Sequence, residues 1–318
     1  MLTHVHIKNF RSFVDAEAAL SPLTLVLGAN GSGKSNFLKF FEMITAERDL
    51  MWVKHLKRED KEIYGEVTHA LEGPILRIGY HLGHFHQQRP SGMLKPLSIY
   101  KPDPDVIAAA EKPTLNPTVK GNGAGTCQVL DSLKTGDRED LFDKIEEAFQ
   151  TYVPEVEKLS LKTVGDAKQI QVRERGLPGP LPATELSEGT RLILCLLTIL
   201  HQESWPRVIL LEDIDRGLHP RLFEYMAPLM RRIAVDHDIN IIATTHNPYL
   251  VNYFRDHKEA VVLVEKQEGE SKLIPLKERI RELNDGNQDV DEVPLGELWF
   301  SGLVGGTPRA IDARPRRA

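Results

Sequence analysis

The sequence of 318 residues predicts an α/β fold in which a mostly parallel sheet is flanked by helices. One sign is a short apolar run at 23–27, followed by a glycine-rich turn and then by apolar residues at helical spacing. Two further apolar runs, 208–211 and 239–245, read as buried strands that end in polar residues. The alternating stretch 2–13 predicts a half-buried strand, which we assign to an antiparallel N-terminal part.

The remaining elements follow from periodicity and from turn-forming residues. Residues 88–126 contain many prolines and glycines and predict a loop-rich insertion. The other expected elements are a helix from the glycine-rich turn to about 48 with a charged helical extension over 48–61, one or two strands over 73–85, a helix over 137–152, a hairpin over 159–173, a helix over 192–201 and a strand pair over 259–276.

Composition describes an ordinary globular chain, with 41% hydrophobic and 27% charged residues. The net charge of −6 argues against a generally basic surface that coats nucleic acid. The two cysteines, Cys127 and Cys195, have no metal-ligand spacing, and Cys195 lies in an apolar helical run, so a disulfide framework is not expected. No apolar stretch approaches a membrane span and no signal peptide is visible, so we expect a cytoplasmic protein without a membrane partner.

Three histidines, His81, His84 and His86, lie on one predicted strand region. They have no accompanying cysteine or close carboxylate. A solvated strand face is therefore favoured over a zinc site, which stays open as the alternative.

The segment Gly28-Ala29-Asn30-Gly31-Ser32-Gly33-Lys34-Ser35 satisfies G-x-x-x-x-G-K-[ST] in full, between a strand and a helix. Backbone N–H groups of such a loop, with the positive end of the helix dipole, suit nucleotide phosphates. Lys34 would reach the β- and γ-phosphates, and the Ser35 hydroxyl would ligate Mg²⁺. The alternative is a glycine-rich turn without a ligand.

A second group of polar residues follows in the C-terminal half. Leu186-Ser187-Glu188-Gly189-Thr190-Arg191 opens an apolar helix, although Ser187 alone would be explained as a helix cap. Glu212 and Asp213 end a buried strand, where one carboxylate can hold Mg²⁺ and the next can orient or deprotonate water. His246 ends the next strand, where a phosphate-sensing role is favoured over a structural one.

In this order, together with Gly217-Leu218-His219-Pro220 and Thr-Thr-His-Asn-Pro, these motifs resemble the ABC-type ATPase family. The likeness is greatest to the SMC/RecF-like and OLD-like members, often labelled "AAA family ATPase". Residues 7–13 resemble the first strand of these proteins. Residues 296–302 resemble a short motif near the ends of these proteins. The resemblance covers 1–45 and 184–304.

The resemblance implies a P-loop NTPase, ABC-ATPase-like core with N-terminal antiparallel strands and an inserted loop-rich and helical lobe. We divide the chain into a first half of the core with the Walker A loop (1–60), the insertion (61–183), a second half with the signature, Walker B acids and switch histidine (184–304), and a basic tail expected to be disordered (305–318).

The same resemblance implies Mg²⁺ and ATP as cofactors. Glu212 falls at the Mg²⁺-associated acid and Asp213 at the catalytic acid, with Lys34 and His246 also in catalytic positions and Ser35 as the second metal ligand. The implied nucleotide contacts are Gly28, Ala29, Asn30, Gly31, Ser32, Gly33, Lys34, Ser35, Asn36 and Arg11, with Ser187, Glu188, Gly189 and Thr190 closing the site from the opposite subunit.

Two features depart from the family pattern. The acids stand as Glu-Asp rather than Asp-Glu, so the expected base is one methylene shorter and slow turnover is expected. No Q-loop can be placed with assurance; Gln87 and Gln88 are weak candidates.

These features predict an ATP-driven homodimer that acts as a sensor or regulator, for example in bacterial defence, through a separate protein effector encoded nearby. A RecF-type DNA-repair ATPase and a non-hydrolysing nucleotide-binding scaffold are the alternatives. Nucleic acid stays open as a partner because of the arginines in 309–317, although such tails are more often solvated. The strand pair at 259–276 leaves too few residues for a Toprim nuclease, so no nuclease is assigned.

Overall fold

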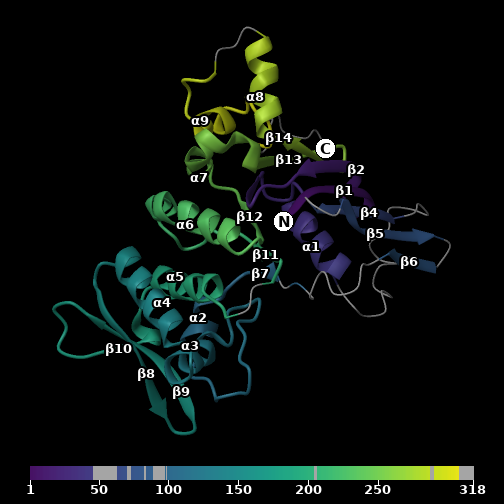
Figure 1. Cartoon of the computed structure of the whole chain (residues 1–318). Coiled ribbons are helices and arrows are strands. Elements are labelled where there is room, and N and C mark those ends of the chain that lie inside the picture. Colours follow the sequence, from purple (N-terminus) through teal and green to yellow (C-terminus); the bar gives the residue numbers. More distant parts are fainter. Residues whose placement is uncertain are drawn as a thin grey trace, which may run out of the picture.

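The computed structural model describes residues 1–45, 63–69, 73–81, 84–88, 97, 99–203, 206–286 and 290–307. Its main feature is an eleven-stranded sheet with the strand order β6-β5-β4-β1-β2-β14-β13-β3-β12-β11-β7. Helices lie on both sides of this sheet, and a separate helical lobe extends from its β7 edge (Figure 1). The α/β class with a P-loop-type core, N-terminal antiparallel strands and an inserted lobe is confirmed.

One half of the sheet is parallel, and it carries the chain segments that the sequence singles out. Its strands are β13 (Val261–Gln267), β3 (Leu23–Leu27), β12 (Asn240–Thr245), β11 (Val208–Leu211) and β7 (Ile99–Tyr100), each parallel to its neighbours. Because all five run in one direction, their carboxyl ends meet at one edge.

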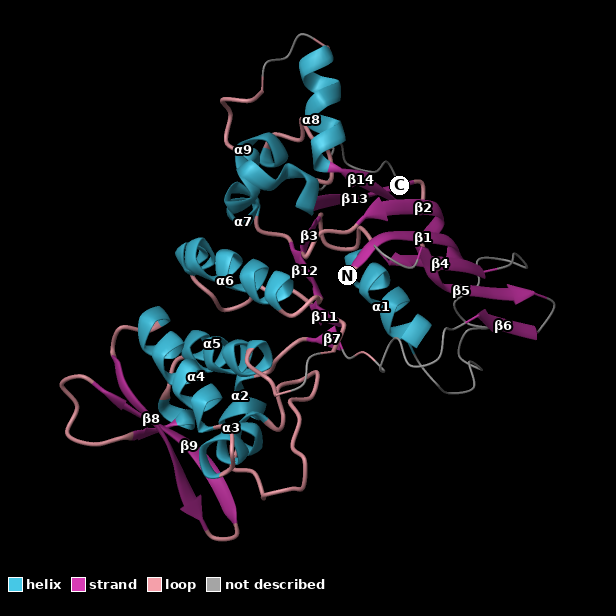
Figure 2. Cartoon of the chain, viewed as in Figure 1, coloured by secondary structure: helices cyan, strands magenta, loops and turns pink. Residues whose placement is uncertain are grey.

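The other half of the sheet is antiparallel and lies near the N-terminus. It contains β1 (Leu2–Phe10), β2 (Phe13–Ala19), β4 (Ile63–His69), β5 (Gly73–His81) and β6 (His84–Gln88). β14 (Glu270–Pro275) joins the two halves, since it is antiparallel to β13 and bridges to β2 in parallel fashion. Figure 2 shows these strands on the side of the sheet away from the helical lobe.

Strand β3 separates two hydrophobic clusters because successive side chains of a strand point to opposite faces. Leu23, Leu25 and Leu27 belong to a large cluster that includes residues of α5 (Glu188–Leu200) and α6 (Phe223–Asp236). Val26 belongs to the other cluster, which includes the buried phenylalanines of α1 (Lys34–Thr45). The glycine-rich loop after β3 is therefore supported from both faces of the sheet.

Five phenylalanines fix α1 against the first two strands. Phe10 packs edge-to-face on Phe40 at 5.6 Å between ring centroids, and Phe13 on Phe37 at 6.5 Å. Phe41 contacts both helix phenylalanines, at 5.3 and 5.9 Å. Edge-to-face pairs of this kind add about 0.5–1.5 kcal/mol each beyond burial. Because α1 begins at Lys34, this cluster also fixes the end of the glycine-rich loop.

The helical lobe lies between β7 and β11 in the sequence. It contains α2 (Pro104–Ala108), α3 (Thr126–Thr135), α4 (Glu139–Tyr152), α5, and a small sheet with the order β10-β9-β8. The hairpin predicted over 159–173 is β8 (Val156–Val164) with β9 (Ala167–Glu174), and β10 (Leu181–Pro182) adds to it. Both cysteines are buried and free here, and burial raises the pKa of the Cys127 and Cys195 thiols to about 12.

The C-terminal part packs beside β13 and β14. It contains α7 (Pro248–Val251), a 3₁₀ segment (Asn252–Ala260), α8 (Leu276–Asp285) and α9 (Leu295–Phe300). Gly296 of α9 allows this close packing, since a Cβ there would lie 2.5 Å from the Pro248 carbonyl oxygen. In the described parts of the chain, no helix is long and apolar enough to cross a membrane.

The structure differs from the sequence expectations in the first strand and in the insertion. The stretch 2–13 is not one strand, because the chain turns at Arg11 and Ser12 and continues as β2. The insertion 88–126 is not only loop, since it contributes β7 and α2. Helix α1 ends at Thr45 in the described chain, and the predicted extension over 48–61 lies outside the described residues. The proposed domain boundaries remain a prediction.

Candidate active site

Strands β3, β12 and β11 bring the candidate residues to one edge of the sheet. The register pairs Thr245 with Leu27 and Leu211 with Ala243, so His246 leaves the sheet beside Gly28, and Glu212 leaves it beside Thr244. Ligands of open α/β sheets bind outside the carboxyl ends of the strands. The strand order therefore assembles one candidate site from segments far apart in sequence.

The glycine-rich loop has the backbone shape that its glycines allow. Gly31 and Gly33 have positive φ angles of 77° and 123°. A Cβ on Gly33 would overlap the hydroxyl of Ser271, which lies 2.5 Å from the Ser32 carbonyl oxygen and 2.8 Å from Ser12 Oγ. Strand β14 and the turn before β2 thus brace the loop from behind, while Asn30 and Gly31 at its tip are exposed.

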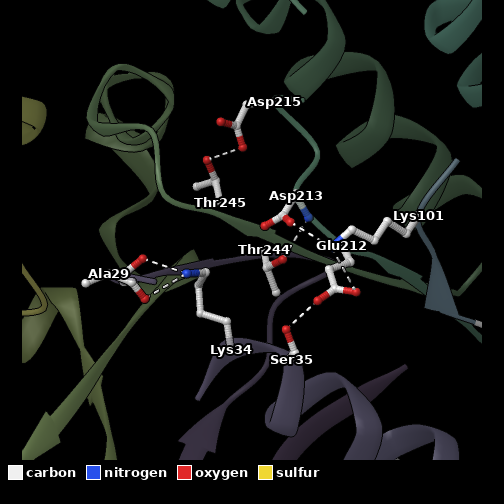
Figure 3. A network of polar contacts seen from close by, with 10 residues as sticks. Ala29, Lys34, Ser35, Lys101, Glu212, Asp213, Asp215, Thr244 and Thr245 are labelled. Carbon is white, nitrogen blue, oxygen red and sulfur yellow. Dashed lines mark hydrogen bonds and ion pairs between the residues drawn. The ribbon is translucent and has the colours of Figure 1, made fainter. Parts of the chain in front are cut away.

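The Lys34 side chain is folded back onto this loop. Its Nζ donates to the carbonyl oxygens of Gly28 at 2.7 Å and Ala29 at 3.0 Å (Figure 3). Burial lowers the pKa of Lys34, and the nearby carboxylates of Asp213, Asp215 and Glu212 oppose that shift. A cation among backbone N–H groups, held only by the loop's own carbonyls, is well placed to exchange them for phosphate oxygens.

Ser35 and Glu212 are in direct contact, although 177 residues separate them in sequence. The Ser35 hydroxyl donates to Glu212 Oε1 (Figure 3). A hydroxyl and a carboxylate are the hard oxygen donors that Mg²⁺ prefers, and Mg²⁺ usually adds substrate phosphates and water to one or two such ligands. The described residues include no cluster of three or more His, Cys, Asp or Glu that could hold a metal alone. The pair therefore fits a metal that arrives with a nucleotide.

A buried polar atom without a partner in the described chain lies in the loop itself. Ser32 Oγ is buried and has no hydrogen-bond partner among the described residues. Burying a hydroxyl without a partner is unfavourable, and a ligand acceptor would remove that cost. Together with the Ser35–Glu212 contact, this atom shows that the loop fits an anionic ligand with a metal.

Asp213 has an unusual backbone conformation for a residue with a side chain. Its φ is +49°, its N–H donates to Thr244 Oγ1 at 3.0 Å, and the next N–H, of Ile214, donates to the Thr244 carbonyl oxygen at 3.0 Å. Residues held in sparsely populated backbone regions cluster at active sites. These bonds turn the chain sharply after β11 and bring the Asp213 carboxylate next to Glu212 (Figure 3).

Arg11 and Asn36 contact each other beside the start of α1. Arg11 Nη1 donates to Asn36 Oδ1 at 3.1 Å, and Asn36 Nδ2 donates to Ser12 Oγ at 2.9 Å. Arg11 Nε is buried without a hydrogen-bond partner among the described residues. The structure thus brings these two predicted nucleotide contacts together next to the glycine-rich loop.

The segment 186–191 forms the start of α5 rather than part of this cluster. Ser187 caps the helix, because its Oγ accepts from the Thr190 N–H at 3.1 Å. Ser187 and Glu188 are exposed, and a Cβ on Gly189 would lie 2.7 Å from the Gly217 carbonyl oxygen. The hydrogen bonds of Ser187 stay within its own turn, so its hydroxyl end is accessible from outside.

The remaining candidates are placed less centrally. His246 is exposed directly after β12, and Asn247, the next residue, caps α7 through a bond from the Tyr249 N–H at 2.9 Å. Gln87 and Gln88 lie in β6, which six strands separate from β3 in the order of the sheet. The side chains of His81, His84 and His86 fall outside the described residues, and with them the zinc alternative.

Comparisons with known proteins agree with this geometry. The family model "AAA ATPase domain" matches residues 1–82, and "AAA domain, putative AbiEii toxin, Type IV TA system" matches residues 128–252. Solved structures with the same fold include an Smc head bound to the C-winged helix domain of ScpA, at a TM-score of 0.60 and 14% identity, covering 86% of this chain and 96% of that one.

Two further structures are SMC heads. The SMC head domain from Thermotoga maritima has a TM-score of 0.51 and 16% identity, covering 86% of this chain and 98% of that one. The Smc head of Pyrococcus furiosus with an extended coiled coil, bound to the C-terminal domain of ScpA, has a TM-score of 0.57 and 12% identity, covering 90% and 99%. No curated protein sequence matches significantly. The chain therefore has the fold of SMC head domains, and parts of its sequence match AAA ATPase family models.

Sequence reasoning missed three residues at this candidate site. Lys101 contacts both acids, Thr244 fixes the backbone of Asp213, and the Gly306 carbonyl oxygen accepts from the Ala29 N–H at 2.8 Å. Gly305 and Gly306, which the sequence places at the start of a tail, thus lie against the P-loop. Only Thr244 had a visible signal, as part of the Thr-Thr-His-Asn-Pro phrase.

Proposed function

We propose that this chain binds Mg²⁺-ATP at Gly28–Ser35 and hydrolyses it to ADP and phosphate. The observation that carries this proposal is the contact of Ser35 with Glu212, made beside the buried ammonium of Lys34. Nothing else in the fold requires a carboxylate, a hydroxyl and a lysine to meet at a glycine-rich loop.

In this proposal each residue has one task. The loop N–H groups and Lys34 hold the phosphates and stabilise charge that develops on the γ-phosphoryl oxygens. Ser35 and Glu212 hold Mg²⁺, which would neutralise phosphate charge when bound. Asp213 accepts a proton from the attacking water, whose oxygen forms a bond to the γ-phosphorus while the bond to the ADP oxygen breaks. His246 follows β12 at the same edge and is assigned to sensing the γ-phosphate.

The first prediction concerns Lys34. Lys34→Ala removes the side-chain cation that donates to the loop carbonyls and should lower ATP affinity at least about 100-fold, by the strength of charge-assisted bonds to phosphate. Isothermal titration with Mg²⁺-ATP measures it. Lys39→Ala, which removes a partly exposed lysine of the same helix, is the matched control. Micromolar affinity retained in Lys34→Ala contradicts the proposed site.

We further propose that ATP closes two copies of the chain into a homodimer, with Ser187–Thr190 of each copy over the P-loop of the other. Exposure of Ser187 and Glu188, and of Asn30 and Gly31 at the loop tip, supports this arrangement. ATP contacts made across the interface would bias an equilibrium between open and closed states, and hydrolysis would release it.

The proposed role is that of a cytoplasmic regulator in bacterial defence that acts through a separate protein. The family description with the words "Type IV TA system" supports the setting, and the two Smc heads bound to ScpA domains are examples of this fold engaging a protein. A native partner should co-purify with the wild type and be lost from Lys34→Ala. Equal recovery of that partner with both proteins contradicts regulation by ATP.

A further inference from the structure

Lys101 lies at the point where the chain leaves the sheet for the helical lobe. It follows β7, whose Tyr100 pairs with Leu211 of β11, so Lys101 emerges beside Glu212. The Tyr100 carbonyl oxygen accepts from the Glu212 N–H at 2.8 Å. The two strands are therefore locked together at the position where the acids begin.

The Lys101 ammonium bridges the two acids. Its Nζ lies 3.0 Å from Asp213 Oδ2 and 3.7 Å from Glu212 Oε2 (Figure 3). Glu212 therefore turns one oxygen, Oε1, to Ser35 and the other to Lys101.

The acids need such a partner because they are adjacent like charges on one strand end. Two neighbouring carboxylates repel each other, and an orientation useful for water activation must be held by another group. Thr244 fixes the backbone of Asp213 but does not contact its carboxylate. Among the described residues, Lys101 is the cation that contacts the carboxylates of both Asp213 and Glu212.

The segment that begins with Lys101 also contacts the start of α5. Arg191, which follows Ser187–Thr190, is 9% exposed and its Nη1 donates to the Pro104 carbonyl oxygen at 3.0 Å and to Asp105 Oδ1 at 2.9 Å. A small cavity of about 40 Å³ is lined by Lys101, both acids and two leucines of α5, Leu192 and Leu196. The segment Lys101–Asp105 thus connects the helix that begins with Ser187–Thr190 to the acids.

We infer that Lys101 is a positioning residue for ATP hydrolysis: it holds Asp213 through Oδ2 and Glu212 through Oε2, leaving their other oxygens for water and for Mg²⁺. This inference rests on the proposed ATPase function and deepens it. It also accounts for a base one methylene shorter than the usual glutamate, since a fixed short carboxylate replaces a longer mobile one. Arg191, in the first turns of α5, holds Pro104 and Asp105 of the segment that begins with Lys101.

The test compares Lys101→Met, Lys101→Gln and Lys101→Arg with the wild type. Steady-state ATP hydrolysis in the two neutral variants should show kcat lowered about 10- to 100-fold with KM changed less than about threefold, because a misplaced base costs the chemical step rather than binding. Lys101→Arg keeps the charge and should recover at least about a third of the wild-type kcat. Lys112→Met, which removes an exposed lysine paired only with Asp166, is the control.

A second readout does not depend on hydrolysis. Mn²⁺ binding in the presence of a non-hydrolysable ATP analogue, followed by electron paramagnetic resonance, reports the metal site. Removing a positive charge beside Glu212 should lower the half-saturating Mn²⁺ concentration by about threefold or more in Lys101→Met, because the carboxylates become more attractive to a cation. A merely structural effect of the mutation would weaken metal binding or leave it unchanged.

Three outcomes overturn the inference. If the kcat of Lys101→Met lies within about threefold of that of an active wild type, Lys101 has no positioning role. That result leaves the proposed ATPase function standing. A lowered kcat without tighter Mn²⁺ binding shows a structural effect instead. A wild type that binds Mg²⁺-ATP without hydrolysing it overturns the proposed hydrolysis, and the positioning role with it.

Discussion

In the proposed site, Asp213 is the side chain that accepts a proton from the attacking water. Its positive φ and its bond to Thr244 hold it in one place, and Lys101 occupies one of its two oxygens. Asp213→Asn keeps the size and can still accept from Lys101, but an amide does not take a proton from water at neutral pH.

We therefore predict that Asp213→Asn traps the protein in its ATP-bound, dimeric state. Asp213→Asn should lose about 100-fold or more in kcat while binding Mg²⁺-ATP nearly as well, since the Ser35–Glu212 pair is spared. Analytical ultracentrifugation at saturating ATP should show a persistent dimer. A monomeric Asp213→Asn under these conditions would mean that the order of the two acids, or the dimer itself, is wrong.

At this scale the sequence motifs named the loop residues and both acids, and the structure brings Lys34, Ser35, Glu212 and Asp213 together. Lys101 could not be found in the same way. It stands in a proline-rich stretch without a motif, and only the pairing of the two-residue strand β7 with β11 places it at the acids.

Among the elements, helix α5 is buried along most of its length but exposed where it begins. Its core-facing length is buried through residues 191–200, whereas Ser187 and Glu188 at its start are exposed. A helix buried in this way is held firmly along its length and leaves its N-terminal turn exposed, where the dipole favours anionic groups, as the proposed dimer requires.

The prediction for α5 separates ATP binding from ATP-dependent dimerisation. Ser187→Arg should leave ATP affinity within about threefold of wild type, because Ser187 makes no contact with the P-loop of its own chain, yet it should abolish ATP-dependent dimerisation and hydrolysis. Size-exclusion chromatography with light scattering, with and without ATP, tests it. Ser160→Arg, on β8, is the control substitution. An ATP-induced dimer of Ser187→Arg would refute the crosswise arrangement.

Helix periodicity and buried runs predicted α4, α5, the hairpin β8–β9 and the pair β13–β14 well, because these segments carry strong local patterns. The turn before β2 was missed because Ser12 is only a weak turn signal and no glycine or proline accompanies it, although Asn9 and Arg11 both adopt positive φ angles. Helix α3 was missed because its apolar residues are few and a glycine tract precedes it.

The whole molecule joins two units that the sequence suggested separately, a sheet with the nucleotide loop and a helical lobe. Figure 1 shows the lobe reaching the sheet through α5, β7 and β11, beside the proposed site. Fold class was predictable because strand and helix patterns alternate along the chain. The strand order was not, since β3 pairs with β12 and β13 from the other end of the sequence, and no local signal specifies such pairing.

That pairing has a consequence for how the protein is made. A ribosome releases β3 and the complete Walker A loop early, yet both neighbours of β3 and the Gly306 carbonyl that receives the Ala29 N–H are synthesised near the end. At ~5–20 residues per second, the loop waits about 10–40 s for β12. The proposed nucleotide site can therefore be completed only after β12 and β13 have been translated.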